Sequence, residues 1–372
     1  MIPCSHVHLK LHADLFVFNG LLFEASPRFG SAVVFSLKEF FAGGESQWLV
    51  DFLRKQNFYV RALVDREATV SNLDFYASHF PYDILHIASH GGEVPGFEIK
   101  EEFTDRHGKK HIVEYDAVQG IAHVEGDAMA AINIKAIFLR FDGFRWMSPE
   151  LEAERIPQYV FEDMRKALFG HQKKSRCLRC IPKSIVPSSC AIVCSDSIHQ
   201  GTFQSLASHS SPIIFNNTCW SWYEVAAFFL ASGARSYVGT LWGIRTDVAV
   251  AGAGVFYENL FTSTVLDAFH KATQAIKSST DRNVYVLWGL HLTTTSMPVS
   301  GTESHQNVFQ ELVRSTLSWI DHAEKSRIAE VKRNSIEIFE SLKKEIMSNF
   351  RDDVHQLPSE INERLHSSSG EA

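Results

Sequence analysis

Two apolar runs in the sequence each end at a side chain that can do chemistry. One run, residues 83–89, ends at His90, which two glycines follow. The other, residues 212–218, ends at Cys219. A histidine that takes the proton of a cysteine leaves a thiolate, and the thiolate is the nucleophile of covalent acyl transfer. The residue types therefore indicate a Cys–His pair, provided that the fold brings the two run ends together.

The first ninety residues contain the elements that deliver the histidine. Apolar runs with strand character lie at 31–37, 59–64 and 83–88, and helical periodicity lies at 45–57 and after Thr69. Short connections between alternating strands and helices favour a parallel sheet with helices on its faces. Ligands bind at the carboxyl ends of such strands. We therefore expect His90 and Cys219 to share one crevice.

The second half of the chain continues the same alternation. Further strands are expected at 135–141, 190–196, 212–218, 236–242 and 284–292, and helices at 160–168, 221–231, 246–260 and 265–276. Gly233 is expected to end one helix, and Thr246-Asp247 to cap the next. The predicted fold class is α/β, caspase-like, with a mostly parallel central sheet of about six strands flanked by helices. A β-hairpin insert and a C-terminal helical appendage complete it.

Breaks in composition suggest a domain organisation. Residues 1–30 are expected to form a β-hairpin extension around Asn19-Gly20, and residues 31–292 the main domain. The main domain carries an insert over about 96–189. The insert is expected to begin with a hairpin at 96–117, to be partly helical over 118–131 and to end in a surface loop over 171–189. A linker at 293–306, two helices over 307–350 and a disordered tail over 351–372 are expected to follow.

Composition excludes several classes of function. The net charge of −7 disfavours direct nucleic-acid binding, and no apolar run reaches the roughly 20 residues of a membrane span. No secretory signal is visible at the start, and six cysteines in 372 residues are too few for a disulfide framework. The expected compartment is the cytoplasm. No cofactor is expected.

Three motifs together resemble those of CHAT domains, which are caspase-like cysteine peptidases distantly similar to separase. The motifs are His-Ile-Ala-Ser-His-Gly at 86–91, Asn-Thr-Cys-Trp-Ser-Trp at 217–222 and Gly-Ala-Arg-Ser-Tyr-Val-Gly-Thr-Leu-Trp at 233–242. That family places a His-Gly pair after one core strand and a cysteine after a later one. A helix then follows, and after it Gly-Ala and a strand that closes on Leu-Trp. The resemblance covers roughly residues 31–292.

The resemblance implies a role for each motif residue. His90 is the general base, Cys219 is the nucleophile, and the backbone N–H groups of Gly91 and Cys219 form the oxyanion hole. The chemistry fits these residues, because a thiolate near an imidazolium and a helix N-terminus is stabilised. Glycine after the histidine lets the backbone approach a substrate carbonyl closely. His86, in the middle of its strand, is interpreted as structural.

Two departures from the caspase pattern limit what is carried over. Caspases have Gln-Ala-Cys with a glycine soon after, whereas this chain has Asn-Thr-Cys-Trp-Ser at 217–221, so a preference for aspartate is not implied. Cys219 follows His90 by 129 residues, against roughly 50 in caspases. The insert accounts for the difference. A lid, a substrate platform and a partner surface are all open interpretations of it.

Several other residues admit a functional and a plain interpretation. Asp142 and Asp247 are candidates for a substrate pocket, but a turn residue and a helix N-cap are the simpler interpretations. Trp220 and Trp242 could wall a subsite or could be core aromatics. Cys219 itself could be a small core residue, and the His90 motif favours the nucleophile.

Four cysteines have a spacing that a zinc site could use, namely Cys177, Cys180, Cys190 and Cys194. His199 could replace one of them. Apolar neighbours around the last two cysteines favour plain burial instead, so metal-free protein is the favoured interpretation.

The sequence thus predicts a cysteine endopeptidase that cleaves a protein substrate through a His–Cys dyad and a thioester, under the control of a partner protein. The alternative is a catalytically silent CHAT-like scaffold that binds a partner protein without cutting it. A Cys–His acyl transferase is the other enzyme that fits the same residues.

Overall fold

The computed structural model describes residues 28–41, 44–123, 130–170, 174–186, 189, 191–200, 203, 205–222, 224–277 and 283–366. The predicted hairpin at 1–30 therefore lies almost wholly outside the described residues. The chain divides into two compact units. Unit 1 comprises Met1–Ser89 and Thr202–Ala372, and unit 2 comprises His90–Gly201.

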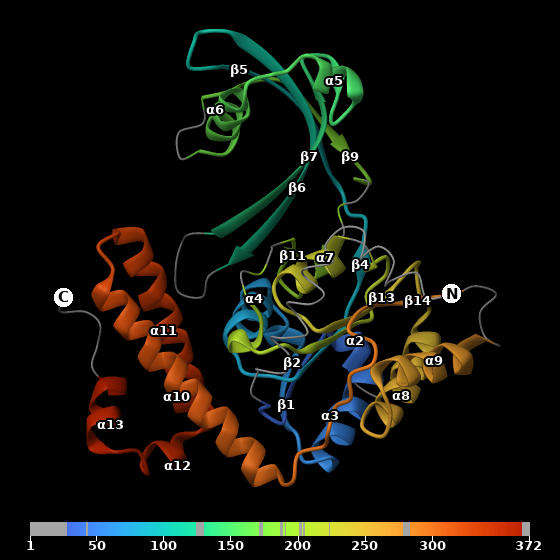
Figure 1. The fold of residues 1–372 in the computed structure, drawn as a ribbon, viewed down its shortest axis with the longest axis vertical. Coiled ribbons are helices and arrows are strands. Elements are labelled where there is room, and N and C mark those ends of the chain that lie inside the picture. The colour runs from blue at the N-terminus through green and yellow to red at the C-terminus, as the bar shows by residue number, and fades with distance from the viewer. Residues whose placement is uncertain are drawn as a thin grey trace. The chain divides into compact units, whose positions relative to one another are not determined.

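Unit 1 is built on a six-stranded sheet with the order β14-β13-β12-β3-β1-β2 (Figure 1). All neighbouring strands are parallel except β14, which is antiparallel to β13. Every residue of β1, β3, β12, β13 and β14 is buried, as expected for strands covered on both faces. The predicted mostly parallel sheet of six strands is confirmed. Its strands are β1 (Ser31–Ser36), β2 (Tyr59–Val64), β3 (Ile84–Ala88), β12 (Ile213–Asn216), β13 (Ser236–Thr240) and β14 (Tyr285–Gly289).

The helices that flank this sheet begin and end at recognisable residues. The Thr69 hydroxyl accepts a hydrogen bond from the Asn72 N–H at 3.1 Å and so caps α4. Gly233, with φ of 112°, follows the end of α7 as predicted. The helices are α2 (Lys38–Phe41), α3 (Glu45–Lys55), α4 (Val70–His79), α7 (Glu224–Ala231), α8 (Thr246–Leu260) and α9 (Val265–Ile276), with short 3-10 turns η1 (Asp65–Glu67) and η2 (Ala207–His209).

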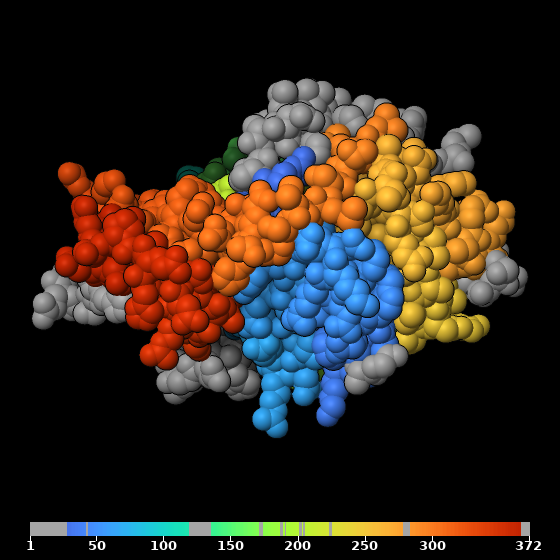
Figure 2. Space-filling view, turned by 90° about the horizontal axis from the view of Figure 1, so that it is seen from below, coloured from blue at the N-terminus to red at the C-terminus, as the bar shows by residue number. Residues whose placement is uncertain are grey.

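The C-terminal helices belong to unit 1. The helices α10 (Gly301–Lys325) and α11 (Ala329–Asn349) confirm the two predicted helices, and α10 packs against β1 and β2. In Figure 2 these orange and red residues lie against the blue N-terminal part of the unit. The predicted linker ends early, because the Ser300 hydroxyl accepts from the Glu303 N–H at 3.1 Å and starts α10.

The predicted disorder over 351–372 is wrong for the described residues. The segment forms α12 (Arg351–Val354) and α13 (Ser359–His366). Two buried apolar side chains hold it, since Val354 is 3% exposed and Leu365 is 0% exposed. These two anchors lie among polar residues, and so the composition of the segment concealed them.

Unit 2 corresponds to the predicted insert and contains two antiparallel sheets. The larger has the order β8-β7-β6-β5-β9, and the smaller has the order β11-β10-β4. Phe103, Tyr115 and Phe141 of the larger sheet pack with Val160 and Met164 of helix α6 in one apolar core. The elements are β4 (Gly91–Gly92), β5 (Gly96–Thr104), β6 (Lys110–His123), β7 (Ala130–Phe141), β8 (Phe144–Arg145), β9 (Arg176–Lys183), β10 (Ala191–Val193), β11 (Ile198–His199), α5 (Pro149–Ala153) and α6 (Gln158–Phe169).

Two predictions inside unit 2 are wrong. Residues 118–123 and 130–131, expected to be partly helical, extend strands β6 and β7, whose pairing runs from Val113 opposite Phe141 to His123 opposite Ala130. The long ladder outweighs the weak helix preference of the small residues. The predicted surface loop at 171–189 contains β9, which pairs with β5 at the edge of the sheet. Its basic residues and Pro182 suggested a loop, but they also suit an edge strand.

A buried carboxyl group joins the C-terminal helices to the rest of unit 1. The Tyr76 hydroxyl donates to Glu345 Oε2 at 2.6 Å, and Arg61 Nε lies 3.5 Å from Glu345 Oε1. Burial raises the pKa of Glu345 above 4.5, and the hydrogen bond from Tyr76 and the charge of Arg61 only partly oppose this rise. The folded protein therefore keeps a proton on Glu345 that the unfolded chain loses first.

This shift predicts a pH dependence of stability. As the pH rises above about 4.5, the wild type should lose stability relative to Glu345→Gln, because the pKa of the carboxyl is higher in the folded state and ionisation favours unfolding. Glu337→Gln on the same helix is the control, since Glu337 is 69% exposed. Urea unfolding at a series of pH values measures the difference. A wild type that gained stability relative to Glu345→Gln as the pH rose would contradict this assignment.

Candidate functional site

The pairing of β3 with β12 brings the two predicted run ends to one edge of the sheet. The strands are parallel neighbours, with Ile87 opposite Asn216. The Asn217 N–H continues the ladder by donating to the Ile87 carbonyl at 2.8 Å. Cys219 therefore follows Asn217, which makes the last hydrogen bond of this ladder, by two residues. His90 follows Ile87 by three residues.

Residues 219–222 form a turn rather than the start of the predicted helix. Helix α7 begins at Glu224, not at Ser221, and Trp220 has a φ of 57°, which a helix does not accommodate. The Ser221 hydroxyl instead donates to the Asn216 carbonyl at 3.1 Å and accepts from the Thr240 N–H at 2.9 Å. The expected contribution of a helix N-terminus at Cys219 is therefore not part of this site.

A backbone amide contacts the sulfur instead. The Ile244 N–H donates to Cys219 Sγ at 3.4 Å, and a Cβ built on Gly243 would lie 4.0 Å from the same atom. An N–H aimed at sulfur bonds a thiolate more strongly than a neutral thiol. The Cys219 side chain is partly exposed, so a reagent can reach it. Among the described residues, no group accepts a hydrogen bond from the Cys219 N–H.

Two tryptophans lie beside this cysteine. The rings of Trp220 and Trp242 meet edge to face with centroids 5.3 Å apart, and the Trp220 N–H donates to the Trp242 carbonyl at 3.3 Å. The side chains are 42% and 41% exposed, respectively. They are therefore surface aromatics rather than core residues.

A buried polar cluster lies directly behind the cysteine turn. The Asn217 side-chain amide donates to Glu45 Oε1 at 2.5 Å and to the Ala249 carbonyl at 3.2 Å, and it accepts from the Tyr285 hydroxyl at 2.6 Å. His86 Nε2 lies 3.0 Å from Glu45 Oε1, but this nitrogen makes no well-aligned hydrogen bond. His86 is 0% exposed, which suits the structural role predicted for it.

Sequence reasoning missed most of this cluster. Glu45 begins a helix, and Tyr257 and Tyr285 lie in apolar segments, so no spacing relates them to the cysteine. Asn217 was inside the motif that carried the resemblance, although no role was assigned to it. Burial raises the pKa values of both tyrosines well above 10.0, and the charge of Glu45 adds to the rise. Both hydroxyl groups therefore remain donors.

The predicted base and one oxyanion donor belong to unit 2. His90 is exposed, and its carbonyl accepts from the Val193 N–H at 2.9 Å. The next residue, Gly91, lies opposite Ile192 in the ladder of β4 with β10. Pairs in an antiparallel ladder alternate between hydrogen-bonded and non-hydrogen-bonded, so the Gly91 N–H is directed away from β10.

The two predicted pocket aspartates have structural partners. Asp142 and Gly143, with φ of 47° and 88°, form the tight turn between β7 and β8. Asp142 also accepts from the Ile112 N–H at 2.8 Å, and its Oδ2 lies 2.7 Å from His111 Nδ1. Asp247 is 62% exposed and pairs with Arg245. Asp247 is not the N-cap of α8, because Arg245 occupies that position without a side-chain cap.

The cysteines proposed as zinc ligands differ in their exposure. Cys177 and Cys180 are exposed on β9, Cys194 is buried, and Cys190 lies outside the described residues. Burial raises the pKa of the Cys194 thiol, which disfavours the thiolate that zinc requires. Within the described ranges, no group of three or more His, Cys, Asp or Glu side chains is arranged to hold a metal ion.

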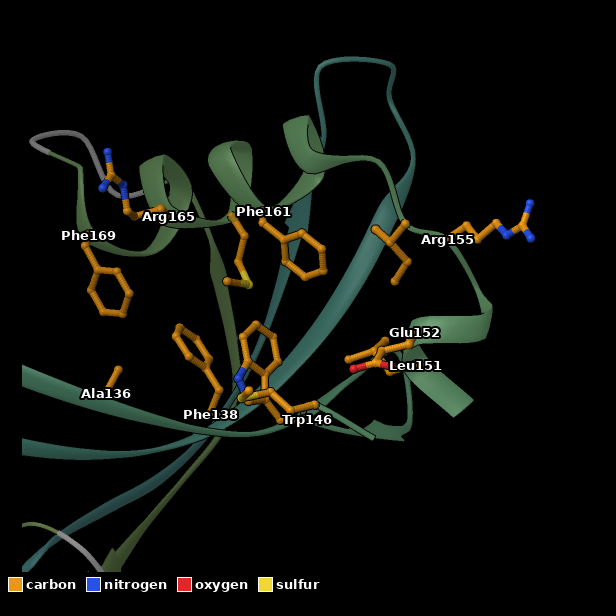
Figure 3. Close-up of a pocket in the computed structure, with 12 residues that line it drawn as sticks. Ala136, Phe138, Trp146, Leu151, Glu152, Arg155, Phe161, Arg165 and Phe169 are labelled. Carbon is orange, nitrogen blue, oxygen red and sulfur yellow. The ribbon is translucent and has the colours of Figure 1, made fainter. Parts of the chain in front are cut away.

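Unit 2 contains a second candidate site, an apolar pocket of about 670 Å³. Figure 3 shows Phe138 and Trp146 on the sheet side facing Phe161 of α6 across the pocket. Arg155 and Arg165 lie at its rim with their side chains directed outward. Its size and lining are those of a site for an apolar group. No motif in the sequence indicated it, because its lining comes from a long hairpin and two helices.

Comparison with protein-family models and with curated proteins gave no match for this sequence. In the part of the chain that the structure describes, no helix has both the length and the apolar character to cross a membrane.

The contact between Gly243 and the sulfur predicts how access to Cys219 can be blocked. Gly243→Leu should slow alkylation of Cys219 by iodoacetamide by at least about tenfold, because the added side chain starts 4.0 Å from the sulfur. Gly254→Leu is the control, since nothing lies within 4 Å of a Cβ at that position. Alkylation is followed by mass spectrometry of the Cys219 peptide. Equal rates in the two variants would show that the sulfur is approached from elsewhere.

Proposed function

We propose that the protein is a cysteine endopeptidase of the CHAT, caspase-like type, with His90 as general base and Cys219 as nucleophile. The observation that supports this most is the parallel pairing of β3 with β12, which makes His90 and Cys219 follow the carboxyl ends of neighbouring strands. The order of elements after Cys219 also agrees with the resemblance. A helix, a left-handed Gly233 and a buried strand follow it.

The reaction follows from the groups at these strand ends. His90 takes the thiol proton, and the thiolate of Cys219 attacks the carbonyl carbon of a peptide bond. The N–H groups of Gly91 and Cys219 hold the oxyanion that forms. The imidazolium returns the proton to the leaving amine as the C–N bond breaks, and a thioester remains on Cys219. Water, deprotonated by His90, then hydrolyses the thioester and frees the thiol.

The site also fits a protein substrate. The exposed pair Trp220 and Trp242 next to Cys219 offers a flat apolar surface for a substrate side chain. Arg245 pairs with Asp247, and so Asp247 is a poor candidate for binding a basic side chain of the substrate. A partner protein controls the enzyme in this proposal, and the insert of unit 2 is the segment that departs most from the caspase pattern.

The apolar pocket of unit 2 is the observation that favours the second candidate, a catalytically silent scaffold of the same family. A pocket of about 670 Å³ lined by aromatic side chains can bind an apolar group of a partner without any chemistry. An assay for cleavage of a peptide substrate distinguishes the peptidase from the silent scaffold.

Cleavage of an unbiased peptide library should depend on both members of the dyad. Cys219→Ala and His90→Ala should each lower the rate by at least about a thousandfold, because each removes a group that takes part in bond making. Cys194→Ala and His107→Ala are the controls, since the first thiol is buried and His107 is an exposed residue in a turn of unit 2. Cleavage that survives either dyad variant would exclude this mechanism. Absence of cleavage by the wild type with its physiological partner present would favour the scaffold.

A further inference from the structure

The polar cluster behind Cys219 is more elaborate than burial alone requires. It places a carboxyl group, an imidazole, an amide and two phenols in the interior of unit 1, where Glu45 is 3% exposed and Tyr257 is 0% exposed. Apolar side chains of similar volume usually stabilise a core at least as well as buried ionisable groups do. A cluster of this kind therefore suggests that a particular geometry is being held.

The hydrogen bonds of the cluster converge on Asn217. Its two amide hydrogens are used by Glu45 and by the Ala249 carbonyl, and its oxygen is used by Tyr285. Its backbone N–H is used by the Ile87 carbonyl. Asn217 is thus held by four elements, namely the start of helix α3, helix α8, strand β14 and strand β3. A side chain with this number of fixed contacts has a single rotamer available.

His86 lies between two other members of the cluster. Tyr257 keeps its proton, and its hydroxyl lies 3.1 Å from His86 Nδ1. The other ring nitrogen, Nε2, lies 3.0 Å from Glu45 Oε1. Glu45 accepts a hydrogen bond from the Asn217 side chain and lies at the positive N-terminal end of α3, where an acidic side chain is favoured. Glu45 is therefore held by Asn217 and by its place at the helix end.

The segment 216–218, which these hydrogen bonds fix, ends one residue before Cys219. The Thr218 carbonyl accepts from the Thr240 hydroxyl at 2.6 Å, and the Thr218 N–H donates to Asn216 Oδ1 at 3.1 Å. Residues 216–218 are therefore tied down by side chains as well as by the sheet. Cys219 is the first residue after them, and its sulfur meets the Ile244 N–H.

We infer that Glu45, His86, Tyr285 and Asn217 are positioning residues for Cys219. Through Asn217 they fix the turn so that the sulfur stays in line with the Ile244 N–H. This inference deepens the proposed function and rests on Cys219 being the reactive group. It does not require that a peptide is the substrate.

The structure offers a matched pair of substitutions to test this role. Tyr285→Phe removes a buried hydroxyl that reaches Asn217, and Tyr82→Phe removes a buried hydroxyl that donates to the Ala77 carbonyl at 2.8 Å. Each variant loses one hydrogen bond and keeps its ring. The alkylation rate of Cys219 by iodoacetamide is measured in both, together with the amide resonance of Ile244 in protein carrying 15N-labelled isoleucine.

Tyr285→Phe should slow alkylation roughly three- to tenfold and shift the Ile244 amide resonance, because the loss of one hydrogen bond loosens the turn. Tyr82→Phe should change neither, even where it lowers thermal stability as much. Glu45→Gln is the second variant, and it should act in the same direction as Tyr285→Phe. An alkylation rate at or above that of the wild type in Tyr285→Phe and Glu45→Gln, with an unmoved Ile244 resonance, would overturn the inference.

The outcomes separate this inference from the proposed function. Slower alkylation in Tyr285→Phe together with undiminished cleavage in Cys219→Ala would support the positioning role and refute the peptidase mechanism. Normal alkylation in Tyr285→Phe together with lost cleavage in Cys219→Ala would refute the positioning role and support the peptidase mechanism.

Discussion

The hydrogen-bonded ladder between β3 and β12 is the interaction on which the candidate site depends. These two strands are far apart in the sequence, and their pairing puts the strand before the His-Gly motif and the strand before Cys219 side by side in the sheet of unit 1. The ladder extends to the Asn217 N–H, so the sheet is continuous up to the turn that carries Cys219. Parallel pairing also requires covered faces, which the helices of unit 1 provide. The proposed chemistry therefore depends on the topology of the sheet together with a few side chains behind Cys219.

Strand positions in unit 1 were predictable because buried parallel strands are short apolar runs between clear breaks. The alternation of β1, β2 and β3 with helices followed from the same pattern, and Gly233 and Thr69 marked helix ends by ordinary rules. The insert was harder to predict. Its long hairpin contains polar and small residues, and pairing of a strand such as β9 depends on a partner distant in the sequence. The C-terminal tail was misjudged because two buried apolar residues hold an otherwise polar segment.

The sequence pointed to the motif residues of the candidate site but not to the side chains that support them. His90, Gly91 and Cys219 stand next to recognisable strand ends, and Trp220 and Trp242 flank the cysteine as their positions suggested. The partner of the sulfur is a backbone amide, that of Ile244, and a backbone amide has no signature in sequence. Glu45, Tyr257 and Tyr285 come from three separate elements, so only the fold joins them to Asn217. The turn at Trp220 stands where a helix start was predicted, and it is tied to β13 on both sides. The Thr240 hydroxyl of β13 donates to the Thr218 carbonyl before the turn, and the Ser221 hydroxyl in the turn accepts from the Thr240 N–H.

Competition among the cysteines for a limiting amount of iodoacetamide tests the central claim, that the fold activates Cys219. Exposure alone favours Cys177 and Cys180, which are exposed, over Cys219, which is only partly exposed. The account predicts that Cys219 is labelled first in the native protein and loses this advantage in denaturant, since the Ile244 N–H and the fixed turn exist only in the fold. Mass spectrometry of the labelled peptides gives the order. Faster labelling of Cys177 and Cys180 than of Cys219 in the native protein would contradict the account.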